Sequence, residues 1–242
     1  MIVAGAALAL WFRFTGFDPQ WRRFGFHYAA AGAINTAIPF TLWAYAALYL
    51  TTGELAVINA TSPMFGALMG VLFLGERLKP GRTLGLLLGV GGVALITGYA
   101  MQTVTVLSVG AGLLAAACYG FIGVYIRFWA REAPARGFAV GTQVGGALVL
   151  LPFAAFAAPT QPLTPLVIWS VIILGVVCGA VGYVLYFRLL ADVGATGALT
   201  VTYLIPLFAM AWGVLFLGEP ITLAMAGGAA LVLAGTVLVL RG

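Results

Sequence analysis

The chain has 242 residues, of which 63% are hydrophobic and only 7% are charged. Exposed apolar surface costs roughly 25 cal/mol per Å² in water, so this composition excludes a soluble globular domain and predicts an integral membrane protein. The formal net charge of +5 indicates membrane topology and contact with anionic lipid headgroups, whereas nucleic-acid binding is not expected.

The first apolar stretch, residues 1–14, is too short for a complete membrane crossing. At a rise of about 1.5 Å per residue it reaches about 21 Å, against a hydrocarbon core of about 30 Å. A secretory signal peptide is disfavoured, because no basic segment precedes the stretch and no small-residue cleavage site follows it. We therefore expect a partial N-terminal helix.

Further apolar runs follow, each close to the roughly 20 residues that a membrane-spanning helix needs. The runs are continuous rather than alternating, which predicts helices and not the strands of a β-barrel. The expected spans are residues 27–50, 54–74, 83–101, 104–126, 138–158, 165–190, 195–217 and 221–240. The predicted fold class is an all-α polytopic membrane protein, a helical bundle with about eight full transmembrane helices.

Positive charge falls on one side of the bundle that these spans predict. Counting crossings places every Lys and Arg on that side, and the loops of the opposite side carry none. Because Lys and Arg are retained in the cytoplasm, we expect the basic loops and the C-terminus to be cytoplasmic. The cations are Arg13, Arg22, Arg23, Arg77, Lys79, Arg82, Arg127, Arg131, Arg136, Arg188 and Arg241. The Ala-rich and Gly-rich composition suggests a bacterial inner membrane.

An internal repeat is the most specific feature of the sequence. The string GVLFLGE occurs at residues 70–76 and again, unchanged, at 213–219, an offset of 143 residues. Further pairs at this offset are Pro63 and Pro206, Gly85 and Gly228, and Gly92 and Gly235. The first string ends on the basic side and the second on the uncharged side, so the repeats are expected to have inverted topology, as in many secondary transporters. The predicted repeats are residues 1–102 and 103–242; the alternative is an ancient duplication kept for packing in a channel or an enzyme scaffold.

The offset also accounts for the short N-terminal stretch. Residues 1–14 match residues 144–157, the later part of a full helix, and the counterpart of the helix starting near Val104 would precede residue 1. The first repeat is therefore expected to lack about one and a half helices, through truncation, a misassigned start codon or genuine loss.

The chain resembles the EamA-like branch of the drug/metabolite transporter superfamily. The resemblance rests on Thr61-Ser-Pro-Met-Phe, Gly70 to Glu76, Gly85 and Gly92, and in the second half on Leu204-Ile-Pro-Leu-Phe, Gly213 to Glu219, Gly228 and Gly235. It implies ten helices in two inverted halves of five, with both termini in the cytoplasm; this sequence departs by lacking the first helix and part of the second. It also implies efflux of small organic metabolites, amino acids or amphiphilic drugs.

Two stripes that contain proline are candidates for the substrate pathway. Asn59 and Pro63 share one helix face, and Thr202 and Pro206 are their counterparts at the same offset. Each proline removes a backbone donor and so frees the carbonyl oxygen of residue 59 or 202. That oxygen can accept a hydrogen bond from a substrate amine, or a neighbouring Ser, Thr or water can close the kink. The sequence leaves both alternatives open.

Other polar or amphipathic side chains within the spans complete the predicted pathway. An aromatic ring with a polar tip suits a partly apolar organic substrate. Ordinary interhelical hydrogen bonding or an interfacial aromatic belt is the alternative role. These candidates are Asn35, Trp43, Tyr45, Tyr119, Gln143, Tyr183 and Tyr203.

Acidic residues are expected at the membrane interface. Glu54 opens one predicted helix, where the helix dipole favours a carboxylate. Glu76 and Glu219 end two others beside a glycine, and Arg77 and Lys79 follow the first of them. No Asp, Glu, Lys or Arg falls at the midpoint of a predicted helix, which favours facilitated diffusion or coupling through other groups.

An enzyme is not predicted. The sequence has one His, and Cys118 and Cys178 fall in separate spans, so neither a metal site nor a disulfide is expected. Motifs for zinc or serine hydrolysis and for ATP or dinucleotide binding are absent from the sequence, so we predict no catalytic residues and no cofactor. A membrane-embedded enzyme is the second interpretation, followed by a channel or a non-transporting truncated scaffold.

Small-xxx-small pairs such as Gly66/Gly70 and Gly85/Gly89 allow close approach of helices. They fit packing within one bundle, which we favour, or a homodimer. The predicted partners are the lipid bilayer and a small-molecule substrate. The predicted function is a secondary transporter, an exporter or facilitator, in which one half rocks against the other around a central cavity to give alternating access.

Overall fold

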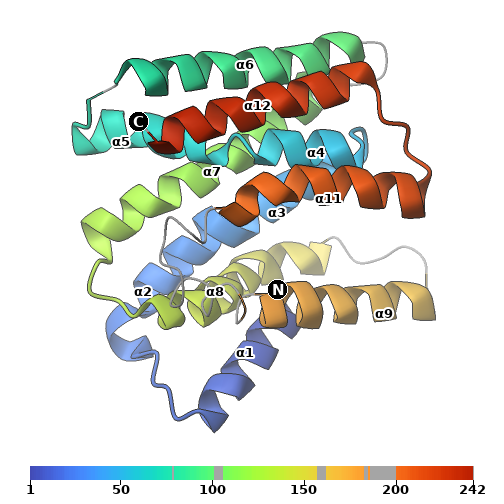
Figure 1. The fold of residues 1–242 in the computed structure, drawn as a ribbon. Helices are drawn as coiled ribbons and strands as arrows, with labels where there is room; N and C mark the ends of the chain where they lie inside the picture. Colours follow the sequence, from blue (N-terminus) through green and yellow to red (C-terminus); the bar gives the residue numbers. More distant parts are fainter. Residues whose placement is uncertain (78, 101–105, 157–161, 183–184, 186–199, 242) are drawn as a thin grey trace. The chain divides into compact units, whose positions relative to one another are not determined.

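The computed structural model describes the chain except for residues 78, 101–105, 157–161, 183–184, 186–199 and 242, and side chains are not described at 97–100, 155–156 and 200–203. Within the described residues, every regular element is a helix (Figure 1). The all-α prediction is confirmed.

The helices belong to two compact units, and each is described by itself. Unit 1 comprises Met1–Ala37 and Tyr125–Ala198, and unit 2 comprises Ile38–Val124 and Leu199–Gly242. Each unit therefore combines segments from both predicted repeats and does not coincide with either of them.

In unit 1, helix α8 is the central element. The helical elements of this unit are α1 (Ile2–Phe14), α2 (Trp21–Gly32), the π-helical turn η1 (Ala33–Ala37), α8 (Ala135–Phe156), α9 (Pro165–Ile173), the π-helical segment η2 (Leu174–Val181) and the end of α7 (Val106–Trp129). Helices α1 and α2 and the turn η1 all pack against α8. The fully buried ring of Tyr28 meets the rings of Trp21 and Phe138 edge-on, with centroids 5.3 and 5.4 Å away.

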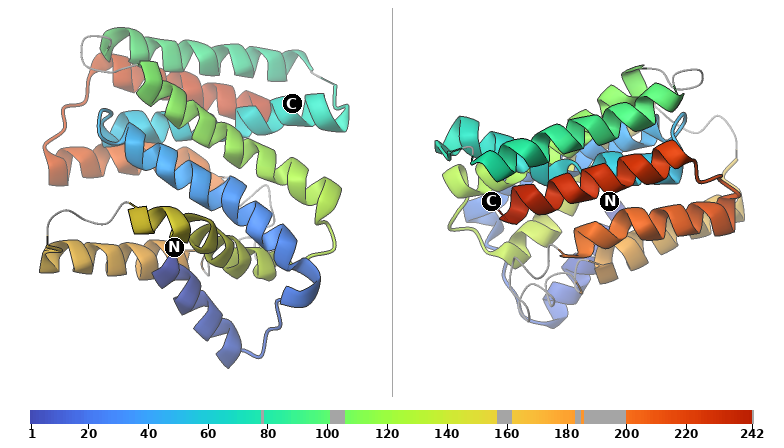
Figure 2. Two further views of the ribbon diagram at one scale, coloured as in Figure 1. Left: turned by 180° about the vertical axis from the view of Figure 1, so that it is seen from behind. Right: turned by 45° about the horizontal axis from the view of Figure 1, so that its top comes forward.

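In unit 2, α6 and α12 pack side by side. The elements of this unit are α3 (Ile38–Ala46), α4 (Thr52–Asn59), α5 (Ser62–Leu74), α6 (Pro80–Ala100), most of α7, α11 (Thr200–Leu217) and α12 (Leu223–Arg241). Figure 1 and Figure 2 both show α6 and α12 side by side, running in opposite directions. The core of this unit includes Val57, Ile58, Met64, Val93, Ile96, Ala229 and Val232.

Glycine pairs bring α6 and α12 into backbone contact. A Cβ atom placed on Gly85 would lie 2.5 Å from the carbonyl oxygen of Gly235. One placed on Gly92 would lie 2.7 Å from the carbonyl oxygen of Gly228. Any larger residue at these positions would push the two helices apart, so the glycines set the distance between them.

Among the described residues, four helical stretches are long and apolar enough to cross a membrane. They are Thr52–Leu74, which combines α4 and α5, Val106–Trp129, Ala135–Ala154 and Leu223–Arg241. Shorter apolar helices cover Ile2–Phe14, Pro80–Ile96, Pro165–Val181 and Leu204–Leu217. A helical fold with several membrane-length helices is confirmed, and the total of about eight full spans stays a prediction.

One helix boundary differs clearly from the expectation. The helix expected over 27–50 begins at Trp21 and continues through η1 into α3. A turn precedes it, in which the Gln20 amide donates to the Asp18 carboxylate over 2.8 Å. Arg22 therefore lies in the first turn of this helix. Its exposed side chain is long enough to extend to the membrane interface.

Candidate functional site

The span formed by α4 and α5 is interrupted near its middle. Helix α4 ends at Asn59 and α5 begins at Ser62, within one 23-residue apolar stretch. Pro63 lies in the first turn of α5, where its missing N–H is tolerated. Discontinuous helices place polar backbone groups at membrane depth, and transporters build substrate sites from them.

The carbonyl oxygen of Asn59 has a donor within the chain. Ser62 Oγ donates to it over 2.6 Å and lies 3.5 Å from the Asn59 side-chain oxygen. This is the local closure that the sequence left open as the second alternative for the proline kink. The half-buried amide side chain of Asn59 is then the polar group at the break that can still meet a solute.

Two further hydroxyl groups bind the neighbouring carbonyl oxygens. Thr61 Oγ1 donates to the Ile58 carbonyl over 2.6 Å. From α12, Thr236 Oγ1 lies 3.0 Å from the Ala60 carbonyl oxygen, across 176 residues of sequence, and 2.8 Å from the Val232 carbonyl oxygen of its own helix, so the two oxygens share its proton. Since Thr236 and Thr61 are both buried, the break is a packed part of unit 2 and not a frayed helix end.

Trp43 of α3 lies beside the end of α4. Its half-buried ring packs against the core cluster that contains Ile58. A Cβ atom placed on Gly112 of α7 would lie 3.3 Å from the Trp43 ring and 3.1 Å from Ile58 Cγ2. The structure therefore brings one predicted pathway residue, Trp43, next to the helix that ends at another, Asn59.

Tyr119 and Tyr45 have different surroundings. Half-buried Tyr119 precedes Gly120, where α7 crosses α5: a Cβ atom on Gly120 would lie 2.5 Å from the Gly66 amide nitrogen. Tyr45 is exposed, and its ring meets that of Tyr49 edge-on with centroids 5.6 Å apart. The exposed tyrosine pair is typical of an interfacial aromatic belt.

In unit 1, two buried polar side chains have unused hydrogen-bonding capacity. Thr36 is 0% exposed and Gln143 is 2% exposed. Neither Thr36 Oγ1 nor Gln143 Oε1 has a hydrogen-bond partner in the described part of the chain. Buried polar atoms are nearly always bonded, so each of these oxygen atoms is available to a hydrogen-bond donor outside the described residues. Sequence reasoning selected Gln143 and missed Thr36, whose only signal is its position beside Asn35, which is half-buried in η1.

Thr36 lies in the π-helical turn η1, directly before the chain enters α3. Helix α8 makes room for this wider turn with a glycine: a Cβ atom on Gly146 would lie 3.0 Å from Thr36 Cβ and 3.2 Å from the Gly32 carbonyl oxygen. Single π-turns inside α-helices occur frequently at functional sites.

The second π-helical segment occurs at the repeat-related position. The offset of 143 residues carries η1 onto residues 176–180, within η2. The packing partners match as well. Gly32 packs on the backbone of α8 at Gly146, and their counterparts Gly175 and Val3 pack together between η2 and α1.

The repeated GVLFLGE string adopts the same turn in both copies. Helices α5 and α11 are followed by Gly75 and Gly218, with φ angles of +66° and +67°. The amide of the next residue donates to the carbonyl oxygen six residues earlier, over 3.2 Å for Glu76 and 3.1 Å for Glu219. Glycine is the residue that adopts this left-handed turn without strain.

The two glutamates of the string have different partners. Glu76 Oε2 accepts a hydrogen bond from Arg82 Nη1 over 2.9 Å. The Glu219 carboxylate accepts from the backbone amide of Thr52 over 3.0 and 3.1 Å and from its hydroxyl over 3.1 Å. Both this contact and the capping box of Glu54 stabilise the N-terminus of α4.

The remaining predicted residues lie on α11 or outside the described part. Tyr183 and the side chains of Thr202 and Tyr203 fall outside the described residues. Pro206 is buried inside α11, which is unbroken. In the described part of the chain, no group of three or more His, Cys, Asp or Glu side chains is placed to hold a metal ion.

A model of the EamA-like transporter family matches residues 1–98 and 106–241, nearly the whole chain. The chain belongs to the EamA-like transporter family. The resemblance drawn from the sequence motifs is confirmed. Family membership together with the apolar helices identifies this EamA-like protein as a multi-pass membrane protein and a membrane transporter.

Relatives of this EamA-like protein carry transporter names. It is 27% identical over 219 residues to a probable terminal-alkyne amino-acid exporter of Streptantibioticus cattleyicolor, covering 88% of this chain and 72% of the relative. It is 25% identical over 220 residues to the uncharacterized transporter YvbV of Bacillus subtilis, covering 88% and 70%. A solved crystal structure matches with a TM-score of 0.67 and 20% identity, over 98% of this chain and 82% of that chain, which shows a shared fold.

Proposed function

We propose that this EamA-like transporter is a secondary carrier that exports small organic solutes by alternating access. Amino acids and amphiphilic compounds are the proposed substrate classes. The amino-acid class is supported by the relative named a probable terminal-alkyne amino-acid exporter. We place the carrier in a bacterial inner membrane, with its basic loops and C-terminus in the cytoplasm.

The observation that carries this proposal is that helix contacts within each unit recur at the 143-residue offset. The offset exchanges Gly85 with Gly228 and Gly92 with Gly235, so the contact between Gly85 and Gly235 maps onto the contact between Gly228 and Gly92. In unit 1, η1 and η2 and their neighbours are related in the same way. Contacts of antiparallel helices that map onto one another support two inverted repeats, the architecture of many alternating-access carriers.

We infer that the moving bodies of the carrier are the two compact units rather than the two repeats. Each unit holds matching pieces of both repeats. The chain passes from unit 1 to unit 2 directly after the π-turn η1, just before the buried Pro39. A π-turn and a proline are both recognised causes of helix bending, so this point is suited to act as a hinge.

In unit 1, the polar groups proposed to contact the solute are Thr36 and Gln143. In unit 2, Asn59 is a separate candidate. Thr36 and Gln143 are buried, Asn59 is half-buried, and their side-chain oxygen atoms can accept hydrogen bonds from the ammonium group of an amino acid. No ionised residue is assigned to the pathway, so the proposal covers facilitated diffusion as well as coupled transport.

Efflux of radiolabelled amino acids and amphiphilic amines from proteoliposomes tests the proposal. We expect Gln143→Leu to lower efflux at least about tenfold, because a hydrogen bond to a charged group contributes roughly 1.5–3 kcal/mol. Thr142→Val is the matched control, since the Thr142 hydroxyl already donates to the Phe138 carbonyl of its own helix over 2.8 Å. An equal loss of efflux in both variants would show that Gln143 does not contact the solute. An absence of efflux from the wild type would contradict the proposal that the protein is a carrier of these solutes.

A further inference from the structure

A groove in unit 2 opens between α5, α6 and α7. Its volume is about 440 Å³, within the range of roughly 300–1,000 Å³ that is usual for ligand sites. Apart from Thr61 its lining side chains are apolar, among them Phe65, Leu68, Leu86 and Val93. The Thr61 hydroxyl already donates to the chain. A polar solute would lose its hydration here without compensation, whereas an alkyl chain would not.

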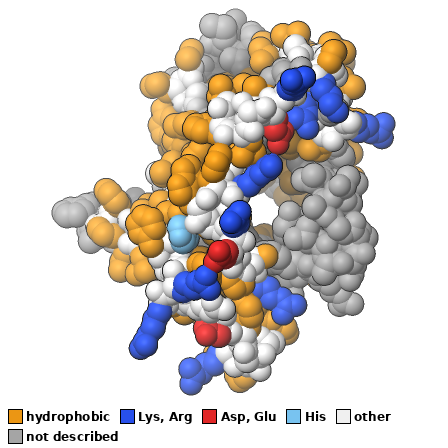
Figure 3. Space-filling model, turned by 90° about the vertical axis from the view of Figure 1, so that its left-hand side faces the viewer, with side chains coloured by type: hydrophobic (Ala, Val, Ile, Leu, Met, Phe, Trp, Pro, Cys, Tyr) orange, Lys and Arg blue, Asp and Glu red, His pale blue; other side chains and the backbone are white. Residues whose placement is uncertain are grey.

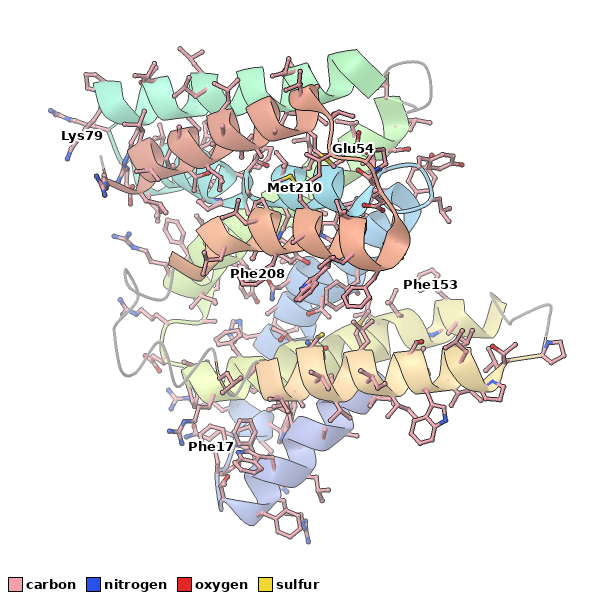
Figure 4. The ribbon with its side chains drawn as sticks, turned by 45° about the vertical axis from the view of Figure 1, so that its right-hand side comes forward. Phe17, Glu54, Lys79, Phe153, Phe208 and Met210 are labelled. Atoms are coloured by element: carbon pink, nitrogen blue, oxygen red, sulfur yellow. The ribbon has the colours of Figure 1, made fainter. Side chains whose placement is uncertain are left out.

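Basic side chains gather at the end of unit 2 where α5 leads to α6. Arg77 and Lys79 are exposed in the connecting loop, and Figure 4 shows Lys79 extending outward from the end of this unit. Arg241 ends α12, whose last turns pack beside Gly85 near the start of α6. Figure 3 shows Lys and Arg side chains grouped near the top of the view around an acidic one. Positive charge therefore prevails at this end, with Glu76 as the acidic residue of the loop.

Arg82 connects the basic end to the groove. It lies one helical turn before Leu86 and two turns before Val90, which both line the groove, so the three share one face of α6. Arg82 Nη1 donates to Glu76 over 2.9 Å. Arg82 Nε is buried and has no hydrogen-bond partner among the described residues. A guanidinium N–H without a partner, close to two exposed cations, favours an anionic oxygen as its acceptor.

Exposed apolar side chains join the groove to the cations. Leu72 lies one turn from Leu68 toward the loop and is 65% exposed, and Leu87 is also 65% exposed. From Arg82 to Val93, α6 rises roughly 16 Å, about the depth of one leaflet of a core about 30 Å thick. The charged end and the apolar groove therefore have the spacing of a headgroup and its acyl chain.

We propose that this part of unit 2 is a binding site for one anionic phospholipid. The acyl chain occupies the groove between α5 and α6, and the lipid phosphate is held by Arg77, Lys79 and Arg82. Basic pockets between membrane helices attract anionic headgroups, and the buried alkyl chain adds hydrophobic stabilisation. The occupant is a lipid and not a transported amino acid, because the groove offers no free polar side chain.

Native mass spectrometry of the full chain in detergent tests the headgroup. Phosphatidylglycerol and phosphatidylcholine with identical acyl chains are the two probes. We expect phosphatidylglycerol to bind at least fivefold more tightly, and Arg77→Gln combined with Lys79→Gln to lower its affinity roughly fivefold per cation. The matched control is Arg131→Gln combined with Arg136→Gln, which removes two exposed cations from unit 1 and is expected to leave the affinity unchanged.

Filling the groove tests the position of the acyl chain. Val90 lines the groove and is 70% exposed, so Val90→Trp is expected to lower the affinity for both lipids while the protein stays folded. Leu215→Trp on α11, also at an exposed apolar position, is the control and should change neither. Circular dichroism checks the helix content of each variant.

Four outcomes would overturn the lipid site. The first is equal binding of the two lipids by the wild type, and the second is an equal loss of affinity in the Arg77/Lys79 variant and in the Arg131/Arg136 control. The third is an unchanged affinity in Val90→Trp. The fourth is displacement of phosphatidylglycerol by inorganic phosphate at the same concentration. The last result would assign the cations to a free anion instead of a lipid.

Discussion

Gly70 and Gly213, the first residues of the repeated string, lie where a side chain would meet the carboxylate that ends the string. A Cβ atom on Gly70 would lie 3.1 Å from Glu76 Oε2, and one on Gly213 would lie 2.5 Å from Glu219 Oε2. The chain reverses through a left-handed glycine, and the carboxylate returns over the last helical turn. The identical strings thus encode one helix-ending turn in two places.

The left-handed glycines predict a measurable cost at the residue scale. Gly75→Ala and Gly218→Ala should each lower the free energy of unfolding by about 1 kcal/mol, because an L residue is strained at positive φ. Gly123→Ala is the control: it is helical, nothing lies within 4 Å of the added Cβ, and it should be neutral or stabilising by up to about 1 kcal/mol. Unfolding titrations with sodium dodecyl sulfate in mixed micelles measure all three. A cost for Gly123→Ala as large as for Gly75→Ala would contradict the role of the turn.

The contact between Glu219 and Thr52 predicts a second stability difference. Glu219→Leu leaves the Thr52 amide at the start of α4 without its acceptor, which should cost about 1–3 kcal/mol. Glu132→Leu removes a carboxylate whose ion pair with Arg23 is 63% exposed on both sides, and should cost less than about 1 kcal/mol. The same titration compares the two variants, and equal costs would mean that Glu219 does not stabilise α4.

Local sequence patterns predicted the contacts of some of these side chains and not of others. The place of Glu54 at a helix N-terminus follows from its position in the sequence, and the capping box is present. The partner of Glu219 lies 167 residues away, so no local pattern indicates it. Thr36 was missed for the same reason, because its burial depends on the approach of Gly146 from another helix.

At the scale of elements, two similar proline motifs have different outcomes. The span with Pro63 is broken, whereas α11 continues through Pro206. Hydroxyl groups precede Pro63, at Thr61 and Ser62, and they bind the carbonyl oxygens that the break exposes. The residues before Pro206 are Leu and Ile, which have no such donors. The proline predicts where a helix is weakened, and at Pro63 the neighbouring hydroxyls stabilise the broken form by binding the exposed carbonyl oxygens.

The break also predicts the effect of a change on a distant helix. Thr236→Val keeps the side-chain shape but removes the hydroxyl that the Ala60 carbonyl of the break shares with the Val232 carbonyl of α12. Because this leaves the Ala60 carbonyl without its donor from α12, the free energy of unfolding should fall by about 1–3 kcal/mol. Thr142→Val removes a bond within one helix only and should cost less than about 1 kcal/mol. A detergent unfolding titration compares them. A cost for Thr236→Val no larger than the control would show that the break does not depend on α12.

Helix positions were largely predictable, and the π-turns were not. Apolar runs mark the described helices within a few residues, except that one begins at Trp21 instead of near 27. A π-turn has the same apolar sequence as an α-turn. Here η1 packs against Gly146 of α8, and η2 packs against Ala4 of α1. Tertiary contacts of this kind leave no periodic signal in the sequence.

At the scale of the whole molecule, the sequence shows the repeat but not the compact units. The repeat is visible because GVLFLGE is kept without change at two positions. The units are built by packing between segments far apart in the chain, such as α6 with α12 and α2 with α8. Residue periodicity predicts which helix face is apolar and not which helix will cover it. The proposed movement of units therefore depends on the structure, and the proposed repeats depend on the sequence.

Counterflow in proteoliposomes tests the carrier proposal most directly. Vesicles that contain the purified chain are loaded with an unlabelled amino acid, and uptake of the labelled compound is followed from outside. A carrier whose binding groups are exposed to one side at a time should take up label faster into loaded than into empty vesicles, and Gln143→Leu should abolish the difference. Equal uptake into loaded and empty vesicles would indicate a channel, and uptake no faster than in protein-free vesicles across the panel would contradict transport of these solutes.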